Sequence, residues 1–140
     1  MSVLKIDQPG DDGFYGLHQL EVNGKYRSAI GGKDLSVVGF DIEVVAKDRL
    51  RFWMVNHQPH VDLEGKLLDA TKLGANSTVE VFELTRGSTK WEHLQTIFSD
   101  AVFTPNNIAA VGDGSFLVTN DHDNKVSMVS VFKLEFPQNY

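Results

Sequence analysis

Two histidines stand three positions apart near the middle of the chain, in Asn56-His57-Gln58-Pro59-His60. Histidine is the side chain that most readily gains or loses a proton near neutral pH, so it serves as a general base and as a metal ligand. A metal site built on such a pair needs a helix to align the rings and a third ligand to complete it. We therefore expect His57 to line a site or to end a strand through a hydrogen bond, and we do not expect a metal held by His57 and His60.

Amide and carboxylate side chains gather in Pro105-Asn106-Asn107-Ile108 and in Asn120-Asp121-His122. Oxygen ligands of this kind bind calcium, which takes about 6–8 of them. Asparagine and aspartate at strand ends also satisfy backbone groups. Both interpretations stay open for Asn106, whereas for the second segment we expect strand-end hydrogen bonds. Asp11-Asp12 lacks the distal glutamate of a calcium loop and predicts a solvated turn.

The composition excludes several functions. The chain has 140 residues, 13 Lys and Arg against 19 Asp and Glu, a net charge of −6 and no cysteine. Without a basic cluster, nucleic acid and anionic membranes are poor partners. Without cysteine, disulfides, thiolate nucleophiles and sulfur-ligated metals are excluded. No apolar signal segment or membrane span stands out in the sequence, so we expect a cytoplasmic protein.

Short β-strands must position these side chains. Apolar runs rich in Val, Ile and Phe, bounded by Gly, Asp and Asn, predict an all-β meander. The run Leu50–Val55 has apolar residues on both faces, as in a strand packed on both sides. Asp113-Gly114 and Asn23-Gly24 predict tight hairpin turns. Ser77–Leu84 and Trp91–Phe98 predict a further strand pair.

An internal echo indicates a repeat. The pattern of Phe40–His57 returns in Asn106–Asp121, and Val81-Phe82-Glu83-Leu84 returns as Val131-Phe132-Lys133-Leu134. Repeated four-stranded units are typical of propeller blades, with Gln58–Asn76 as an inserted loop.

The inserted loop and the last residues carry their own expectations. Leu67–Lys72 predicts one helical turn that Gly74 ends. Two interpretations of the segment from Asn124 to Tyr140 stay open: Val129–Leu134 forms a strand that echoes Val79–Leu84, or the reading frame runs into sequence not meant to be translated.

Four ordered blocks carry a resemblance to a known family. They are Arg49–Pro59, Asn76–Phe82, Thr104–Gly112 and Thr119–His122. Their order and spacing resemble the serum paraoxonase/arylesterase family, most closely its fungal branch. The resemblance implies a six-bladed β-propeller with calcium in its central tunnel, which hydrolyses lactones, aryl esters or organophosphates, and a more distant relation to gluconolactonases.

A full propeller of that family is more than twice as long as this chain. The resemblance therefore implies a segment of about two to three blades near the N-terminal half of the family, and we expect residues 1–140 to form a single partial β-propeller domain. A blade buries its faces against its neighbours, so an open arc leaves faces and edges exposed. We expect such a chain to be marginally stable or to self-associate through its open blade edges.

The resemblance also assigns roles to residues. Asn106 matches a ligand of the catalytic calcium, and Asn107 matches an aspartate ligand of a structural calcium. Phe40 matches a residue that lends only its backbone carbonyl to the structural calcium. His57 matches the second histidine of a pair, which positions the first, and the first falls at Val38. Valine cannot accept or relay a proton, and asparagine at position 107 removes a charge from the metal site.

Three interpretations stay open. The first is calcium-dependent hydrolysis of a lactone or ester, in which Asn106 helps to hold the metal and His57 lines the site. The second is a non-hydrolytic propeller of pericyclase type, or one that binds an apolar metabolite, in fungal secondary metabolism; Val38 and Asn107 favour it. The third is an inactive remnant. In both functional cases the partner is a small molecule.

Overall fold

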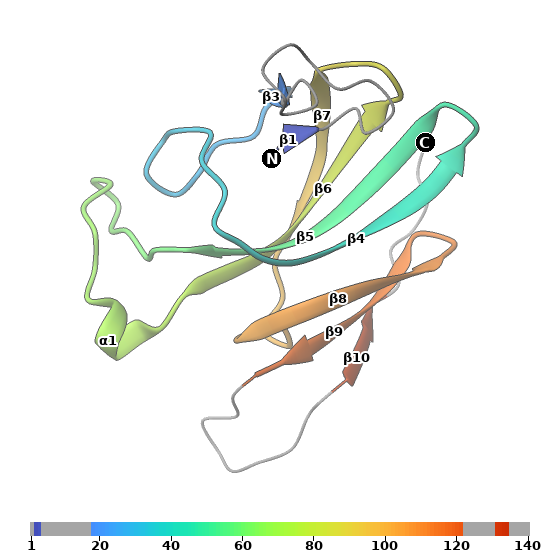
Figure 1. The fold of residues 1–140 in the computed structure, drawn as a ribbon. Coiled ribbons are helices and arrows are strands. Elements are labelled where there is room, and N and C mark those ends of the chain that lie inside the picture. Colours follow the sequence, from blue (N-terminus) through green and yellow to red (C-terminus); the bar gives the residue numbers. More distant parts are fainter. Residues whose placement is uncertain (1, 4–17, 122–130, 135–140) are drawn as a thin grey trace, which may run out of the picture.

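The computed structural model describes residues 2–3, 18–121 and 131–134 and confirms an all-β fold (Figure 1). No helix in these ranges has the length and apolar character of a membrane span. Asp11-Asp12, His122 and most of the segment after Asn124 lie outside the described residues. The elements in chain order are β1 (Ser2–Val3), β2 (His18–Gln19), β3 (Glu21–Asn23), β4 (Val37–Ala46), β5 (Arg49–Gln58), α1 (Ala70–Leu73), β6 (Asn76–Thr85), β7 (Lys90–Ile97), β8 (Pro105–Gly112), β9 (Ser115–Asn120) and β10 (Val131–Leu134).

Two main sheets lie one against the other. The first has the strand order β3-β7-β6-β5-β4, and the second has the order β10-β9-β8. Each sheet is an antiparallel meander apart from β3, and β4 of the first sheet packs against β8 of the second (Figure 1). Successive meanders that meet at their first strands have the arrangement of a propeller segment. The number of blades stays a prediction.

The sequence echo corresponds to structural repetition. Phe40–His57 falls on the hairpin of β4 and β5, and Asn106–Asp121 falls on the hairpin of β8 and β9. The second echo places Val81–Leu84 in β6 and Val131–Leu134 in β10, each the third strand of its meander. The predicted strand at the end of the chain is therefore confirmed for these four residues.

One predicted turn is confirmed and one predicted hairpin is wrong. Asp113 and Gly114 join β8 to β9 with φ values of 54° and 80°, the left-handed conformation that a tight hairpin requires. Gly24 also has a positive φ, of 82°, but no paired strand follows it. Instead β3 pairs in parallel with β7, and the buried ring of Tyr26 packs edge-on against Phe82. Tertiary packing thus pairs β3 with β7 instead of with the residues that follow Gly24.

Side chains of β5 and β6 alternate between two cores, which confirms that β5 is packed on both faces. The core between the two sheets, called the inter-sheet core, contains Trp53, Val55, Val79, Val81, Ile97, Val102, Ile108, Phe116 and Val118. The core on the opposite face, called the N-terminal core because the segment before β4 covers it, contains Leu20, Tyr26, Phe52, Met54, Phe82, Leu84 and Trp91.

A buried carboxylate lies in the N-terminal core. Glu80 is 2% exposed, and its carboxylate accepts hydrogen bonds from the hydroxyls of Thr78 and Thr96, both at 2.6 Å. His93 Nε2 lies 3.0 Å from the same carboxylate. A buried carboxylate is costly unless it is hydrogen-bonded, and the hydroxyls of Thr78 and Thr96 meet that condition. This group of four residues is called the Glu80 network below.

Tyr26 borders this network and gives the fold a dependence on alkaline pH. Its hydroxyl donates to the carbonyl of Asp34 at 3.0 Å and accepts from Asn56 Nδ2 at 3.2 Å. Burial, with a smaller contribution from the charges of Glu80 and Asp34, raises the pKa of Tyr26 from 10.0 to about 12. The pKa of Tyr26 is higher in the folded chain than in the unfolded chain. The contribution of Tyr26 to the free energy of unfolding is therefore complete below pH 10 and is lost as the pH rises from 10 to 12.

We expect Tyr26→Phe to weaken that dependence. Between pH 9 and pH 11 the ionisation of Tyr26 should lower the free energy of unfolding of the wild-type chain by about 1.4 kcal/mol. The loss in the variant over the same range should be smaller by this amount. Urea unfolding of both proteins at the two pH values measures the difference. Lysines titrate equally in both, so equal losses would contradict the assignment.

The strand β4 forms an edge of the first sheet. Its side chains Val38, Phe40, Ile42 and Val44 are exposed, and the strand contains neither lysine nor proline, which commonly protect such edges. Self-association through this edge stays a prediction.

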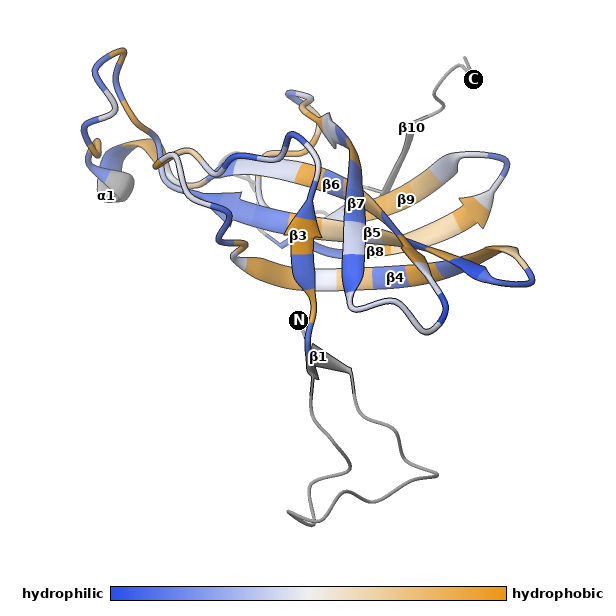
Figure 2. Cartoon of the chain, turned by 90° about the horizontal axis from the view of Figure 1, so that it is seen from above, coloured by the Kyte–Doolittle hydropathy of each residue, from blue (hydrophilic) through white to orange (hydrophobic). Residues whose placement is uncertain are grey.

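The insertion between β5 and β6 forms a projecting loop (Figures 1 and 2). Its helical turn, α1, begins three residues later than predicted, and Gly74, with a φ of 72°, follows its last residue as predicted. Asp62 Oδ1 accepts hydrogen bonds from the backbone of Glu64 and Lys66, which fixes the tip of the loop.

Candidate functional site

His57 connects the end of β5 to the beginning of β8. Its side chain is partly buried, and Nε2 lies 2.8 Å from the carbonyl oxygen of Pro105. Because a carbonyl can only accept, Nε2 carries the proton and Nδ1 is the acceptor nitrogen of the neutral ring. The backbone nitrogen of His57 donates to the carbonyl of Ser36 at 2.9 Å. The predicted strand-end hydrogen bond is thus present, and it fixes the tautomer of His57.

Gly39 allows β4 and β8 to approach each other at their backbones. A Cβ atom at this position would collide with the carbonyl oxygen of Asn106 and would lie 3.0 Å from Asn107 Cα and 3.1 Å from Asn107 Oδ1. Backbone atoms cannot yield as the end of a flexible side chain can, so only glycine fits here. This contact places Phe40 next to the Asn106-Asn107 pair.

The three residues predicted as calcium ligands therefore lie on neighbouring parts of β4 and β8, but they differ in the hydrogen bonds that their side chains make. Asn107 Oδ1 accepts a hydrogen bond from the nitrogen of Ile108 at 2.9 Å. The side chains of Asn106 and Phe40 are exposed. Asn107 is exposed as well, so the two amides differ in the hydrogen bond that engages Asn107 Oδ1 and not in their exposure.

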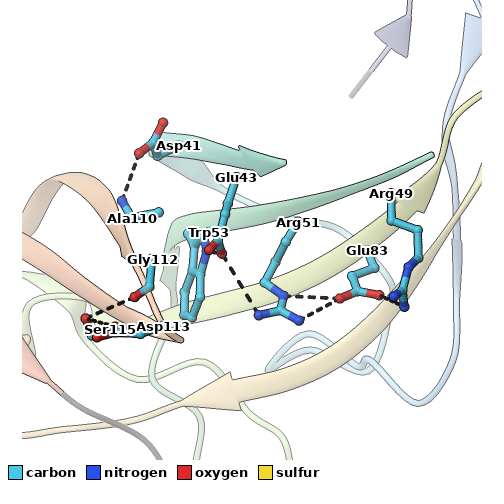
Figure 3. Close-up of polar contacts among 10 residues, drawn as sticks. All are labelled: Asp41, Glu43, Arg49, Arg51, Trp53, Glu83, Ala110, Gly112, Asp113 and Ser115. Atoms are coloured by element: carbon cyan, nitrogen blue, oxygen red, sulfur yellow. Dashed lines mark hydrogen bonds and ion pairs between the residues drawn. The ribbon is translucent and has the colours of Figure 1, made fainter. Parts of the chain in front are cut away.

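The described residues do not by themselves fit a calcium ion. Calcium takes about 6–8 oxygen ligands, preferably with carboxylates among them. In ranges 18–121 and 131–134 no three His, Cys, Asp or Glu side chains come together as metal ligands. Asp41, beside Phe40, uses Oδ1 for the nitrogen of Ile42 and Oδ2 for the nitrogen of Ala110, both at 2.8 Å (Figure 3). Asn106, Asn107 and Phe40 are therefore an incomplete ligand set.

Asn120 has the predicted role of a strand-end tie. Its Oδ1 accepts from the nitrogen of Thr104 at 3.2 Å, and its Nδ2 donates to the carbonyl of Ala101 at 2.9 Å. The nitrogen of Asp121 donates to the carbonyl of Thr104 at 2.7 Å. These bonds hold the connection between β7 and β8 in place, and with it the carbonyl of Pro105 that orients His57.

A charged cluster occupies the opposite ends of the strands (Figure 3). Arg51 donates through Nε and Nη2 to Glu83 Oε1, at 3.1 Å and 2.8 Å. Glu83 Oε2 also lies 3.6 Å from Arg49, and Glu43 accepts from Trp53 Nε1 at 3.2 Å. No motif marks these residues in the sequence. The signal that could have found them is the register, which places Arg51 directly opposite Glu83.

A family model described as Arylesterase matches residues 67–137, just over half of the chain. The chain belongs to the arylesterase family. The match begins in the loop before α1 and includes β6 to β10, so it covers the Asn106-Asn107 pair but not His57 or Phe40. The fungal origin suggested by the sequence stays a prediction.

Curated relatives of the chain agree with the family. Serum paraoxonase/arylesterase 2 of Gallus gallus is 32% identical over 84 residues, which cover 60% of the chain and 20% of the relative. Serum paraoxonase/arylesterase 1 of Rattus norvegicus is 43% identical over 56 residues, 40% of the chain and 16% of the relative. The same protein of Mus musculus is 44% identical over 48 residues, 34% of the chain and 14% of the relative. The chain thus spans a fifth or less of these relatives.

Val38 occupies the position expected for the first histidine of the pair. In the structure it lines an apolar cavity of about 390 Å³ together with Leu35, Val37, Phe40 and Trp91. A hydrocarbon side chain there cannot act as a base, so His57 is the histidine that this region offers for proton transfer.

Proposed function

We propose that this chain supplies part of an ester- or lactone-hydrolysing site, located where β5 ends and β8 begins. The membership in the arylesterase family supports the reaction class. The hydrogen bond between His57 and Pro105 supports the location, because it holds an imidazole at the residue that precedes Asn106. This contact is the observation on which the proposed site depends.

The chemistry proposed for His57 follows from its tautomer. Nδ1 accepts a proton from water while the water oxygen forms a bond to the acyl carbon, and the proton then passes to the alcohol oxygen as the acyl–oxygen bond breaks. The carbonyl of Pro105 fixes the ring and stabilises the imidazolium that forms between these steps. Calcium dependence is the finer part of the proposal. Asn106, Asn107 and the Phe40 carbonyl are the ligands that this chain would contribute to a calcium ion.

Turnover of phenyl acetate by His57→Gln tests the role of the imidazole. Glutamine retains an N–H for the Pro105 carbonyl but has no basic nitrogen, so kcat should fall about a hundredfold while the circular dichroism spectrum is unchanged.

His60→Gln is the matched control and should retain the wild-type rate. Full activity of His57→Gln, or no turnover by the wild-type chain with and without calcium, would overturn the proposal. A calorimetric calcium titration separates the metal from the base, because turnover without any heat of calcium binding would remove only the calcium.

The apolar cavity around Val38 favours a second candidate, non-hydrolytic binding of an apolar metabolite. Trp91 lines this cavity, so a bound molecule should change its fluorescence. A response to naphthalene that EDTA leaves intact and Val38→Glu abolishes would support this function, and strict calcium dependence would exclude it.

A further inference from the structure

A second cavity, of about 500 Å³, lies between the inserted loop and the connection from β7 to β8. Its volume is in the range of small-molecule sites, about 300–1,000 Å³. The loop contributes its side near α1, and the end of β7 and the beginning of β8 lie across from it (Figure 1). The residues of its wall that matter here are His60, Leu73, Ser77, Phe98, Val102 and Phe103.

Ser77 is the unusual residue of this wall. It is 3% exposed, and its hydroxyl has no hydrogen-bond partner within the described part of the chain. Burying a hydroxyl without a partner is unfavourable, and such groups commonly await a ligand or an ordered water. The register places Ser77 opposite His57, and alternation along β6 puts its side chain on the same face as Val79, toward the second sheet. Rotation about one bond is enough to turn the hydroxyl to the cavity.

Part of the remaining wall is apolar and open to solvent. Phe98 is 66% exposed and Leu73 is 51% exposed, although both are large hydrophobic side chains. Together with Phe103 they surround the same cavity as Ser77. Exposed hydrophobic side chains that gather around one hollow mark a binding site more often than scattered ones do.

The charges on the wall limit the kind of ligand. The ammonium of Lys72 is 3.7 Å from Asp69 and therefore has a counter-ion, whereas the wall also includes the carboxylate of Asp100. An anionic ligand would meet this carboxylate at close range. The walls thus favour a neutral molecule, with an apolar body and a single polar group.

We propose that this cavity binds a neutral aromatic molecule that carries one hydroxyl or carbonyl group. The ring packs against Phe98, Phe103 and Leu73, and the oxygen hydrogen-bonds with the hydroxyl of Ser77, with His60 as a second polar neighbour. This binding does not depend on the hydrolytic function proposed for His57.

Fluorescence titration of the full chain with 2-naphthol in the presence of EDTA tests the site. We expect saturable binding, a Kd raised five- to tenfold in Ser77→Ala, and a Kd raised at least tenfold in Phe98→Ala. Ser28→Ala is the matched control, because Ser28 is also buried with an unpartnered hydroxyl in the described structure but does not line the cavity. Its Kd should equal that of the wild type.

Two further measurements separate a ligand site from a structural role. The thermal midpoint of Ser77→Ala should equal or exceed that of the wild type, because the substitution removes an unpartnered buried hydroxyl. His57→Gln should bind 2-naphthol as the wild type does, whatever the outcome for hydrolysis. Absence of saturable binding, or equal Kd values for Ser77→Ala and Ser28→Ala, would overturn the proposal.

Discussion

Replacing Glu80 with alanine should lower the free energy of unfolding by about 4 kcal/mol, because it breaks a buried hydrogen-bonded network. The substitution removes a carboxylate that accepts two hydroxyl hydrogen bonds at 2.6 Å and lies 3.0 Å from His93. Thr78 and Thr96 would then keep donors in the N-terminal core without this acceptor. Alanine also leaves an unfilled space beside Phe82.

Urea unfolding at neutral pH measures this loss, and two variants calibrate it. Glu80→Gln preserves the volume and one oxygen acceptor, so we expect it to lose about half as much. Glu64→Ala removes an exposed carboxylate from the inserted loop and should stay within about 0.5 kcal/mol of the wild type. A Glu80→Ala variant as stable as Glu64→Ala would show that the Glu80 network does not stabilise the fold.

Gly39→Val should cost about 3 kcal/mol and should also separate the two sheets at the candidate site. Every atom that a Cβ would meet at this position belongs to Asn106 or Asn107, and the closest one is a backbone carbonyl oxygen. To avoid this collision β8 must move away from β4, and this movement also displaces Pro105 from His57. We therefore expect a loss of stability together with a loss of phenyl acetate turnover.

Gly87→Ala provides the comparison for this prediction. Gly87 has open space around its Cα but a φ of 83°, so alanine there meets backbone strain without collision and should cost about 1 kcal/mol. Urea midpoints of the two variants give the ranking. A Gly39→Val variant more stable than Gly87→Ala would contradict the close approach of β4 and β8.

The parts of the fold that the sequence predicts are those set by local rules. Alternation and composition are sufficient to predict β5 and β6, and the Asp113-Gly114 pair is sufficient for its hairpin, because the left-handed conformations are a property of those two residues. The same rule fails at Asn23-Gly24, where Tyr26 gains more from packing on Phe82 than a short hairpin offers. Local chemistry permits a turn there, but distant contacts decide which strand follows.

The candidate site divides in the same way. The resemblance to a known family placed His57 and Asn106 in one site. In the structure His57 contacts the carbonyl of Pro105, the residue that precedes Asn106. The contact of Gly39 with Asn106 and the Glu80 network could not be predicted, since each joins residues from different strands in a register that no local pattern specifies. In particular, the β6–β7 register shifts between Val81 and Phe82, within the strand that carries Glu80.

The parallel pairing of β3 with β7 has a consequence for biosynthesis. Asn23 and Glu92, which are hydrogen-bonded across this pair, are separated by 69 positions, whereas each strand from β4 to β6 pairs with the next strand along the chain. A nascent polypeptide therefore makes the early strand long before its partner leaves the ribosome. Until then Leu20 and Tyr26 cannot pack against Trp91. A chaperone that binds the segment containing β3 would delay the pairing of β3 with β7 without hindering the pairing of β4 to β7.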